Sequence, residues 1–185
     1  LDAISQALES YWNRHATPIT DRLALQSLEH SLPIFENLVS ATPSESDFTH
    51  IAEASLLAGM CISQTRTALA HAMSYPMTAR FGVPHGLACG ITLPAILRFN
   101  AQEDPTGKLT ILALHFGFDS VESLALHLDA LLLKSHALLV AKKYLSSAEE
   151  ILPFAVEMVY PGRSDNNLRS ASVEDIQGIL RQTFL

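Results

Sequence analysis

Apolar residues recur along this chain at the three- and four-residue spacing of helices that bury one face. In the segment 20–40, for example, Leu25, Leu28 and Leu32 follow this spacing, and we expect Thr20 to cap the start of the helix. Alternating runs rich in Val, Ile, Thr and aromatic residues, which would indicate strands, are nearly absent. The pattern therefore predicts an all-α fold, a multi-helix bundle.

Proline, glycine and polar clusters divide this pattern into segments. We expect a long helix to start near Ser46 and to end where Pro76 removes a backbone donor. The segment 82–84 predicts a second break, and the polar segment 162–170 is expected to be a solvated loop. The expected helices cover residues 3–14, 20–40, 46–76, 86–99, 105–115, 120–134, 146–160 and 172 onward, the last two begun by the capping-box pairs Ser146 with Glu149 and Ser172 with Asp175.

Composition indicates one globular domain over residues 1–185. Of the 185 residues, 48% are hydrophobic and 17% are charged, and a chain of this length buries roughly 70% of the surface that its unfolded form exposes. The formal net charge is -7, from 12 basic and 19 acidic residues, which argues against a nucleic-acid partner and against an anionic membrane surface. We therefore expect small molecules or protein as partners, and the sequence leaves the oligomeric state open, a homo-oligomer included.

Neither the apolar runs nor the cysteines point to a membrane or secreted protein. The longest apolar stretch, 86–97, is interrupted by Pro94 and is shorter than the ~20 residues of a membrane-spanning helix. Cys61 and Cys89 lie among apolar residues, which is typical of reduced cysteines. The sequence therefore predicts a cytoplasmic protein.

Two histidines can converge only if the chain turns between them. His71 and His85 are fourteen residues apart, which on one unbroken helix would separate them by ~21 Å along the axis. The expected breaks at Pro76 and 82–84 allow the chain to reverse, so that two imidazoles face one cavity. Neutral imidazole is the commonest transition-metal ligand in proteins. Taken alone, the pair is weak evidence for a metal site, because histidines near helix ends are more often capping or core residues.

The N-terminal segment offers a carboxylate. Asp2 and Gln6 are four residues apart and so share one helix face, with Glu9 a further turn along. An Asp in the first turn is ordinarily a favourable partner of the helix dipole. By this reasoning alone, Asp2 is a cap.

Two stretches of the chain resemble one enzyme family. They are DAISQALESYWN at the start and ALAHAMSYPMTARFGVPHGLACGITLP from Ala68 to Pro94. Together they resemble the metal-binding segments of the iron-containing alcohol dehydrogenases, and the closing NNLRSASVEDIQGIL resembles that family's C-terminal end. The His-x13-His-Gly spacing preceded by Val-Pro is the specific part of the match. The resemblance implies the helical C-terminal domain of a two-domain dehydrogenase.

The family resemblance implies a metal site, and this sequence departs from the family's residues at two positions. Asp2, His71 and His85 match the family's carboxylate ligand and two of its three histidine ligands. Gln6 stands where the third histidine belongs, and an amide oxygen is a weaker metal ligand than imidazole. Three alternatives follow: Gln6 completes the ligand shell, a water takes that position, or the metal site has been lost. Tyr75 stands where many members carry another histidine on the substrate side. Tyr75 is therefore either a catalytic proton donor or a half-buried aromatic.

The same resemblance implies an NAD(P)-linked alcohol dehydrogenase or aldehyde reductase. Fe2+, or Zn2+ or another divalent ion, would act as a Lewis acid on the substrate oxygen while hydride moves to or from the nicotinamide. No strand followed by a Gly-rich turn occurs in this chain, which opens on Leu1. We expect the nucleotide-binding domain to precede it, so that this domain is inactive alone.

Further residues suggest a substrate class. The stretches SQALESYWNRHATPITD and SQTRTALAHAMSYP resemble the branch of the family that reduces phosphonoacetaldehyde. An anionic substrate favours a guanidinium near the metal. Arg80, between the histidines, is the better candidate, and Arg66 is the second, although on an ideal helix it lies about 140° from His71.

Other functional classes remain to be weighed against this one. A non-catalytic helical interaction or regulatory bundle would have incidental histidines and no metal, and a metal-free reductase of the same family would follow from Gln6. A His-Asp phosphohydrolase and a di-iron bundle are disfavoured, because the chain contains neither a His-Asp dipeptide nor a Glu followed three residues later by His.

Overall fold

The computed structural model describes residues 1–40 and 42–185, and in these ranges the regular structure is helical throughout. This confirms the predicted all-α class. The elements are α1 (Asp2–Tyr11), α2 (Pro18–Ser40), α3 (Glu45–Thr65), α4 (Leu69–Phe81), α5 (His85–Gly90), α6 (Leu93–Ala101), α7 (Lys108–His115), α8 (Val121–Lys134), α9 (Ala137–Ala141), α10 (Ala148–Ile151) and α11 (Val173–Thr183), with the 3-10 helices η1 (Leu152–Met158) and η2 (Ser164–Asn166).

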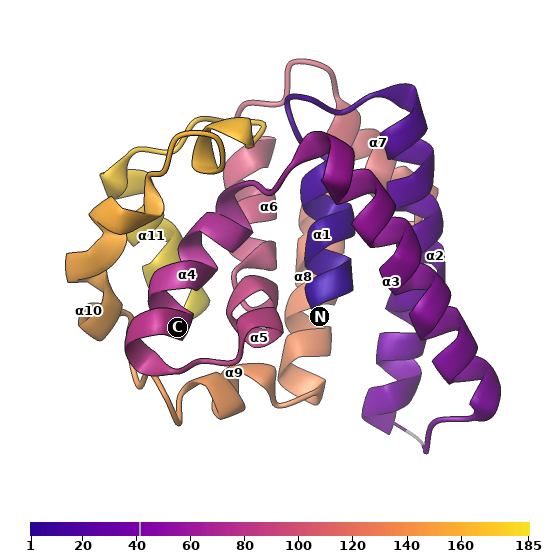
Figure 1. Ribbon diagram of the computed structural model, residues 1–185, viewed down its shortest axis with the longest axis horizontal. Helices are drawn as coiled ribbons and strands as arrows, with labels where there is room; N and C mark the ends of the chain where they lie inside the picture. The colour runs from indigo at the N-terminus through magenta and orange to yellow at the C-terminus, as the bar shows by residue number, and fades with distance from the viewer. Residues whose placement is uncertain (41) are drawn as a thin grey trace.

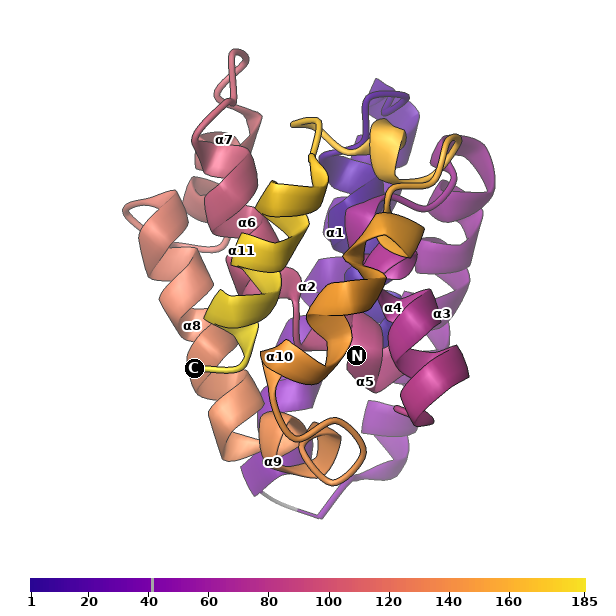
Figure 2. The same cartoon turned by 90° about the vertical axis from the view of Figure 1, so that its left-hand side faces the viewer.

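The helices pack around a shared core. Figure 1 shows α2 and α3 on one side, α10 and α11 on the other, and α1, α5, α6 and α8 between them. In the turned view of Figure 2, α11 lies over α6 and beside η1, and α4 packs against the same 3-10 segment. α1 contacts α2, α3 and α5. The largest fully buried side chains include Trp12, Leu8, Leu28, Leu69, Met73, Met77, Ile96, Leu97 and Leu112.

The long helix expected over 46–76 is in fact two helices, so this prediction is wrong. α3 ends at Thr65, and Arg66 takes a left-handed backbone conformation with φ of 64° before α4 begins. Ser10, in the last turn of α1, and Asn13, just beyond the end of that helix, hold this break. The Asn13 side-chain amide donates to the Arg66 carbonyl at 3.2 Å, and the Thr65 hydroxyl donates to Ser10 Oγ at 3.0 Å. These contacts join segments more than fifty residues apart, so helical periodicity does not predict them.

Pro76 lies inside α4 rather than at its end. An interior proline costs a helix about 3 kcal/mol. Met73 and Met77, on either side of it, are fully buried, and each such side chain contributes about 1.5–3 kcal/mol by its burial. Packing therefore offsets the lost hydrogen bond, and the helix continues to Gly82, whose φ of 72° ends it. The expected break at 82–84 is confirmed.

Other boundaries were partly predicted. The predicted Ser172–Asp175 box is confirmed, and Ser120 caps α8 at the start of the helix expected over 120–134. α2 begins at Pro18, ahead of Thr20, and the helix expected over 86–99 is divided into α5 and α6. The expected Ser146–Glu149 box does not form, because Glu150 instead accepts the Ser146 backbone N–H.

The segment 162–170 is not the solvated loop that was expected. Asn166 and Asn167 are buried. The Asn166 side-chain amide donates to the Thr67 carbonyl at 2.9 Å, and the Asn166 backbone carbonyl accepts from the Arg14 backbone N–H. Asn167 pairs with Asn100 at 2.6 Å. The loop therefore packs across the ends of α1, α4 and α6.

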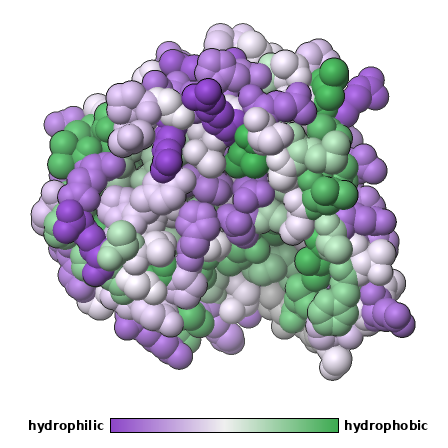
Figure 3. Space-filling view, in the orientation of Figure 1, coloured by the Kyte–Doolittle hydropathy of each residue, from purple (hydrophilic) through white to green (hydrophobic). Residues whose placement is uncertain are grey.

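The surface carries apolar side chains at several places. Figure 3 shows green side chains over α3, where Phe48, Leu56 and Met60 are exposed. In the part of the chain that the structure describes, no helix combines the length and the apolar character needed to cross a membrane.

Candidate metal centre

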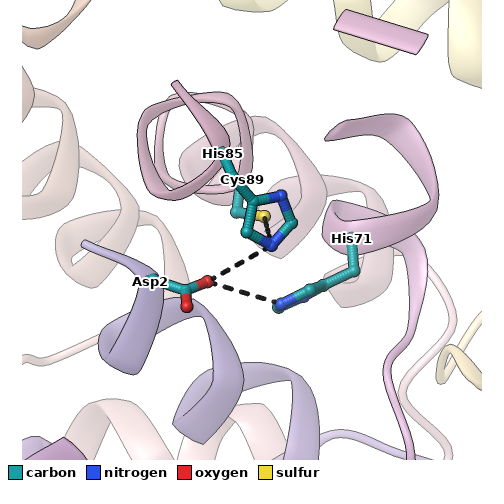
Figure 4. Close-up of side chains that lie close together, drawn as sticks. All are labelled: Asp2, His71, His85 and Cys89. Carbon is teal, nitrogen blue, oxygen red and sulfur yellow. Dashed lines mark hydrogen bonds and ion pairs between the residues drawn. The ribbon is translucent and has the colours of Figure 1, made fainter. Parts of the chain in front are cut away.

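Three helices bring Asp2, His71 and His85 together. Asp2 opens α1, His71 lies in the first turn of α4, and His85 opens α5. Asp2 Oδ1 lies 3.5 Å from His71 Nε2 and 3.7 Å from His85 Nε2, and the two rings meet edge to face with centroids 5.4 Å apart. Figure 4 shows the three side chains pointing toward one another. The structure thus brings together the three residues selected from the sequence.

The arrangement of the donor atoms suits a cation. Asp2 Oδ1 is buried and has no hydrogen-bond partner among the described residues, which is costly unless another group satisfies it. Its distances to the two imidazole nitrogens are longer than ordinary hydrogen bonds. They are close to the ~3.4 Å that separates two donor atoms bound tetrahedrally to one ion at about 2.1 Å. Carboxylate and imidazole are ligands for Fe2+ and Zn2+, so the residues present fit a divalent ion.

Glu9 supports this centre from behind His71. Its side chain is fully buried, and Oε2 contacts His71 Nδ1 at 2.5 Å. Its two oxygens also accept the backbone N–H groups of Ala68 and His71, both at 3.2 Å, and of Ala70. Glu9 therefore caps α4 and fixes the His71 tautomer with Nε2 free to face Asp2.

The surrounding charges set the protonation of His71. Burial alone would lower the pKa of the imidazole, but its contacts with Asp2, Cys89 and Glu9 outweigh this effect and raise the pKa of His71 to about 12. Conversely, the His71 contact holds the pKa of Asp2 below its usual value, against the effect of burial. Two carboxylates flanking one imidazole form a site that favours a cation, either a proton on His71 or a divalent ion in its place.

His85 is held by Ser74 and lies beside Cys89. The Ser74 hydroxyl donates to the His71 carbonyl at 2.8 Å, so its oxygen is available to accept from His85 Nδ1 at 3.4 Å. This arrangement leaves His85 Nε2 facing Asp2. Cys89 Sγ lies 3.9 Å from the same nitrogen. The four side chains Asp2, His71, His85 and Cys89 can place one ligand atom each within 4.8 Å of one another.

A glycine makes the close approach of α1 and α5 feasible. A Cβ atom built on Gly86 would lie 3.1 Å from Asp2 Cβ and 3.3 Å from the Asp2 backbone nitrogen. Any larger side chain must therefore displace Asp2. The glycine that follows His85 in the sequence is explained by this contact.

Gln6 and Tyr75 take places around the centre. The Gln6 side-chain amide donates to Asp2 Oδ2 at 3.1 Å, so in this arrangement Gln6 orients the carboxylate and does not offer its oxygen to the centre. Tyr75 is 37% exposed and stacks on the His85 ring, with centroids 6.0 Å apart and an interplanar angle of 22°. Tyr75 therefore stands at the open side of the histidines.

The two arginines selected from the sequence do not reach this centre. Arg80 lies in the last turn of α4, nine residues beyond His71 and so on the opposite helix face. It pairs with Glu157 at 2.5 Å and lies over the Phe154 ring at 4.3 Å. Arg66 is exposed at the end of α3.

Sequence reasoning did not select Glu9, Cys89 or Arg163. The spacing of Glu9 was informative, because residues seven apart lie about 20° from alignment on a helix and Glu9 therefore shares the face of Asp2. Cys89 follows His85 by four residues, again one helix face. Arg163 lies with its guanidinium carbon 4.3 Å from the Tyr75 ring centroid. It sits in a loop, where no periodicity points to it.

A second group of metal-ligand side chains lies on α2 and α3. His30, His50 and Glu53 can place ligand atoms within 4.8 Å of one another. The two rings are stacked, with centroids 5.3 Å apart and 22° between planes. Parallel stacked rings do not aim their in-plane nitrogens at a common point, so we assign no site there.

The fold and the centre define an all-α domain with a carboxylate and two histidines arranged for a divalent metal ion. Residues 1–184 match the family model described as Fe-containing alcohol dehydrogenase family, C-terminal. The chain therefore belongs to the iron-containing alcohol dehydrogenase family and represents its C-terminal region. This confirms the resemblance noted in the sequence.

Individual relatives agree with this assignment. The chain is 30% identical to a 1,3-propanediol dehydrogenase of Citrobacter freundii, over 100% of this chain and 49% of that protein. It is 32% identical to a phosphonoacetaldehyde reductase of Streptomyces viridochromogenes, over 54% of this chain and 25% of that protein. A sulfoacetaldehyde reductase of Bifidobacterium kashiwanohense, solved with NAD+, has the same fold, with a TM-score of 0.84 at 24% identity over 99% of this chain and 48% of that one. The chain spans about half the length of the first of these relatives and of this solved structure.

Proposed function

We propose that this chain supplies the metal- and substrate-binding half of an NAD(P)-linked alcohol dehydrogenase acting on small aldehydes and alcohols. The observation that carries the proposal is the buried Asp2 Oδ1, which has no hydrogen-bond partner among the described residues and faces His71 Nε2 and His85 Nε2. A purely structural cluster would pair that oxygen with a donor. Family membership supports the same class of reaction.

In this proposal Asp2, His71 and His85 hold Fe2+ or Zn2+. The bound ion supplies Lewis acidity toward the substrate oxygen, as the nicotinamide supplies hydride. Glu9, Ser74 and Gln6 keep the three side chains oriented.

Tyr75 is proposed as the catalytic proton donor. Reduction of an aldehyde requires a proton on the substrate oxygen after hydride arrives at carbon. The Tyr75 ring stacks on His85 and the residue is partly exposed, so in this proposal its hydroxyl regains a proton from water.

Phosphonoacetaldehyde is the proposed substrate within this class. The support is the similarity to the phosphonoacetaldehyde reductase, which covers 54% of this chain. Other relatives carry names of neutral substrates, such as lactaldehyde reductase of Escherichia coli, so the proposal requires a local group that recognises the anion.

The nucleotide is proposed to bind mainly to a separate N-terminal domain. The described residues contain no strand, and the Gly-rich turn that cradles a dinucleotide pyrophosphate follows a strand. This domain would then be inactive in isolation and would still bind metal.

Metal content tests the proposal. The protein is incubated anaerobically with Fe(II), or with Zn(II), desalted, and analysed by elemental mass spectrometry. We expect about one ion per chain, lost in the double variant His71→Ala/His85→Ala and in His85→Gln. His85→Gln is included because the His85 side chain is 41% exposed, so its replacement leaves the core intact. Circular dichroism verifies that this variant keeps its helical content.

His15→Gln is the matched control, since His15 is exposed and its side chain has no partner among the described residues. Equal metal content in the control and in both site variants would exclude this centre.

A further inference from the structure

A groove lies directly beside the candidate metal centre. It has a volume of about 320 Å³ and is formed by α4, the end of η1 and the loop that precedes η2. Tyr75, Glu157, Tyr160 and Arg163 are the polar side chains that line it. Because Tyr75 also stacks on His85, the groove and the metal centre share a wall.

Arg163 is positioned in this groove by two aromatic rings. Its guanidinium carbon lies 4.3 Å from the Tyr75 ring centroid and 5.4 Å from that of Tyr160. Stacking engages the faces of a guanidinium and leaves its N–H edge available for a bidentate contact with an oxyanion. The Arg163 side chain makes no hydrogen bond or ion pair with any residue that the structure describes.

The carboxylate in the same groove is already neutralised. Arg80 holds Glu157 through Nε to Oε2 at 3.0 Å and Nη2 to Oε1 at 2.5 Å. Glu157 therefore does not take the Arg163 charge. In a chain of net charge -7, the groove has an arginine whose charge is not compensated by any described partner.

We propose that Arg163 determines substrate specificity by binding the anionic group of a short aldehyde, a phosphonate in the first instance. The inference rests on the proposed function and assigns to Arg163 the role that the sequence suggested for Arg80. A neutral aldehyde would leave the guanidinium unused, so Arg163 would favour anionic substrates.

The distances suit a two-carbon substrate. The Arg163 guanidinium carbon lies 4.3 Å from the Tyr75 ring centroid, and that centroid lies 6.0 Å from the His85 ring centroid. The guanidinium carbon therefore lies no more than about 10 Å from the imidazole. A carbonyl oxygen and a phosphonate oxygen of one two-carbon molecule are ~4 Å apart. Adding ~2 Å for a metal–oxygen bond and ~2.9 Å for a hydrogen bond gives a total span of similar size to the distance between the Arg163 guanidinium and the His85 imidazole.

The test measures anion binding without metal, so that its outcome is independent of the metal centre. Methylphosphonate is titrated against the protein in the presence of EDTA and followed by phosphorus NMR. We expect saturable binding that weakens at least about 10-fold in Arg163→Gln. Arg163→Lys should retain part of the affinity because it keeps the charge, and Arg22→Gln, on an exposed part of α2, should bind like the unaltered protein.

A double variant separates the two arginines. Arg80→Gln/Glu157→Gln removes both charges of the ion pair, and we expect methylphosphonate binding to persist. Loss of binding in this variant with retention in Arg163→Gln would assign the anion to Arg80. That result, or the absence of saturable binding to the unaltered protein, would overturn the inference. Methylphosphonate binding together with absence of bound metal would instead contradict the proposed function alone.

Discussion

Replacing Glu9 with Gln probes how the metal centre is built into the fold. Glu9 Oε1 accepts the N–H groups of Ala70 and His71, and Oε2 accepts those of Ala68 and His71 Nδ1. A Gln side chain keeps one oxygen and turns an NH2 group toward the donors on the other side. In either orientation two of these hydrogen bonds are lost in a fully buried place.

The expected cost is large relative to total stability. Hydrogen bonds to a charged group contribute about 1.5–3 kcal/mol each, so Glu9→Gln should lower the free energy of unfolding by about 3–6 kcal/mol. Domains are stable by about 5–15 kcal/mol. The same change should weaken metal binding 10- to 100-fold, because His71 loses the carboxylate that orients it.

Urea unfolding followed by circular dichroism measures the first effect, and competition with a chromophoric zinc chelator measures the second. Glu174→Gln is the matched control, since Glu174 is exposed on α11, and we expect a change below about 0.5 kcal/mol. If Glu9→Gln unfolds within 1 kcal/mol of the unaltered protein and binds zinc equally well, the assigned role of Glu9 is wrong.

Three further predictions follow from single contacts. Gly86→Ala should weaken zinc binding by displacing Asp2, whereas Gly59→Ala, which meets no atom within 4 Å, should leave it unchanged in the same titration; equal affinities would contradict the contact. Tyr75→Phe should lower kcat for aldehyde reduction about 100-fold or more in the active enzyme with little change in KM, and an unchanged kcat would remove Tyr75 as proton donor. Burial raises the pKa of the Cys61 thiol, which keeps it protonated at pH 8, so a disulfide reagent should modify it only as fast as the protein unfolds.

Local sequence signals predicted the helical class and two helix ends. Ser172 with Asp175 forms the expected box, and Gly82 ends α4 as expected. These features depend on residues within one turn of each other, which is the range over which capping and glycine effects act.

The predictions of local structure that proved wrong have a different cause. The break at Arg66 depends on Asn13, in the segment that follows α1, and the burial of Asn166 depends on Thr67. Pro76 continues a helix because neighbouring methionines are buried. In each case a tertiary contact overrides a local preference, and one sequence carries no signal for it.

The candidate site was predicted where family resemblance supplied the residues and missed where orientation mattered. Asp2, His71 and His85 converge as expected. Glu9 was overlooked although it lies on the face of Asp2, and Arg80 was favoured because its partner Glu157, 77 residues away, was not visible in the sequence.

The most direct test of the central claim is anomalous X-ray diffraction from crystals of the zinc-loaded protein, collected on both sides of the zinc absorption edge. The account predicts one anomalous peak within bonding distance of Asp2 Oδ1, His71 Nε2 and His85 Nε2. A peak elsewhere with none at these three atoms, or no peak in crystals whose solution binds zinc, would contradict it.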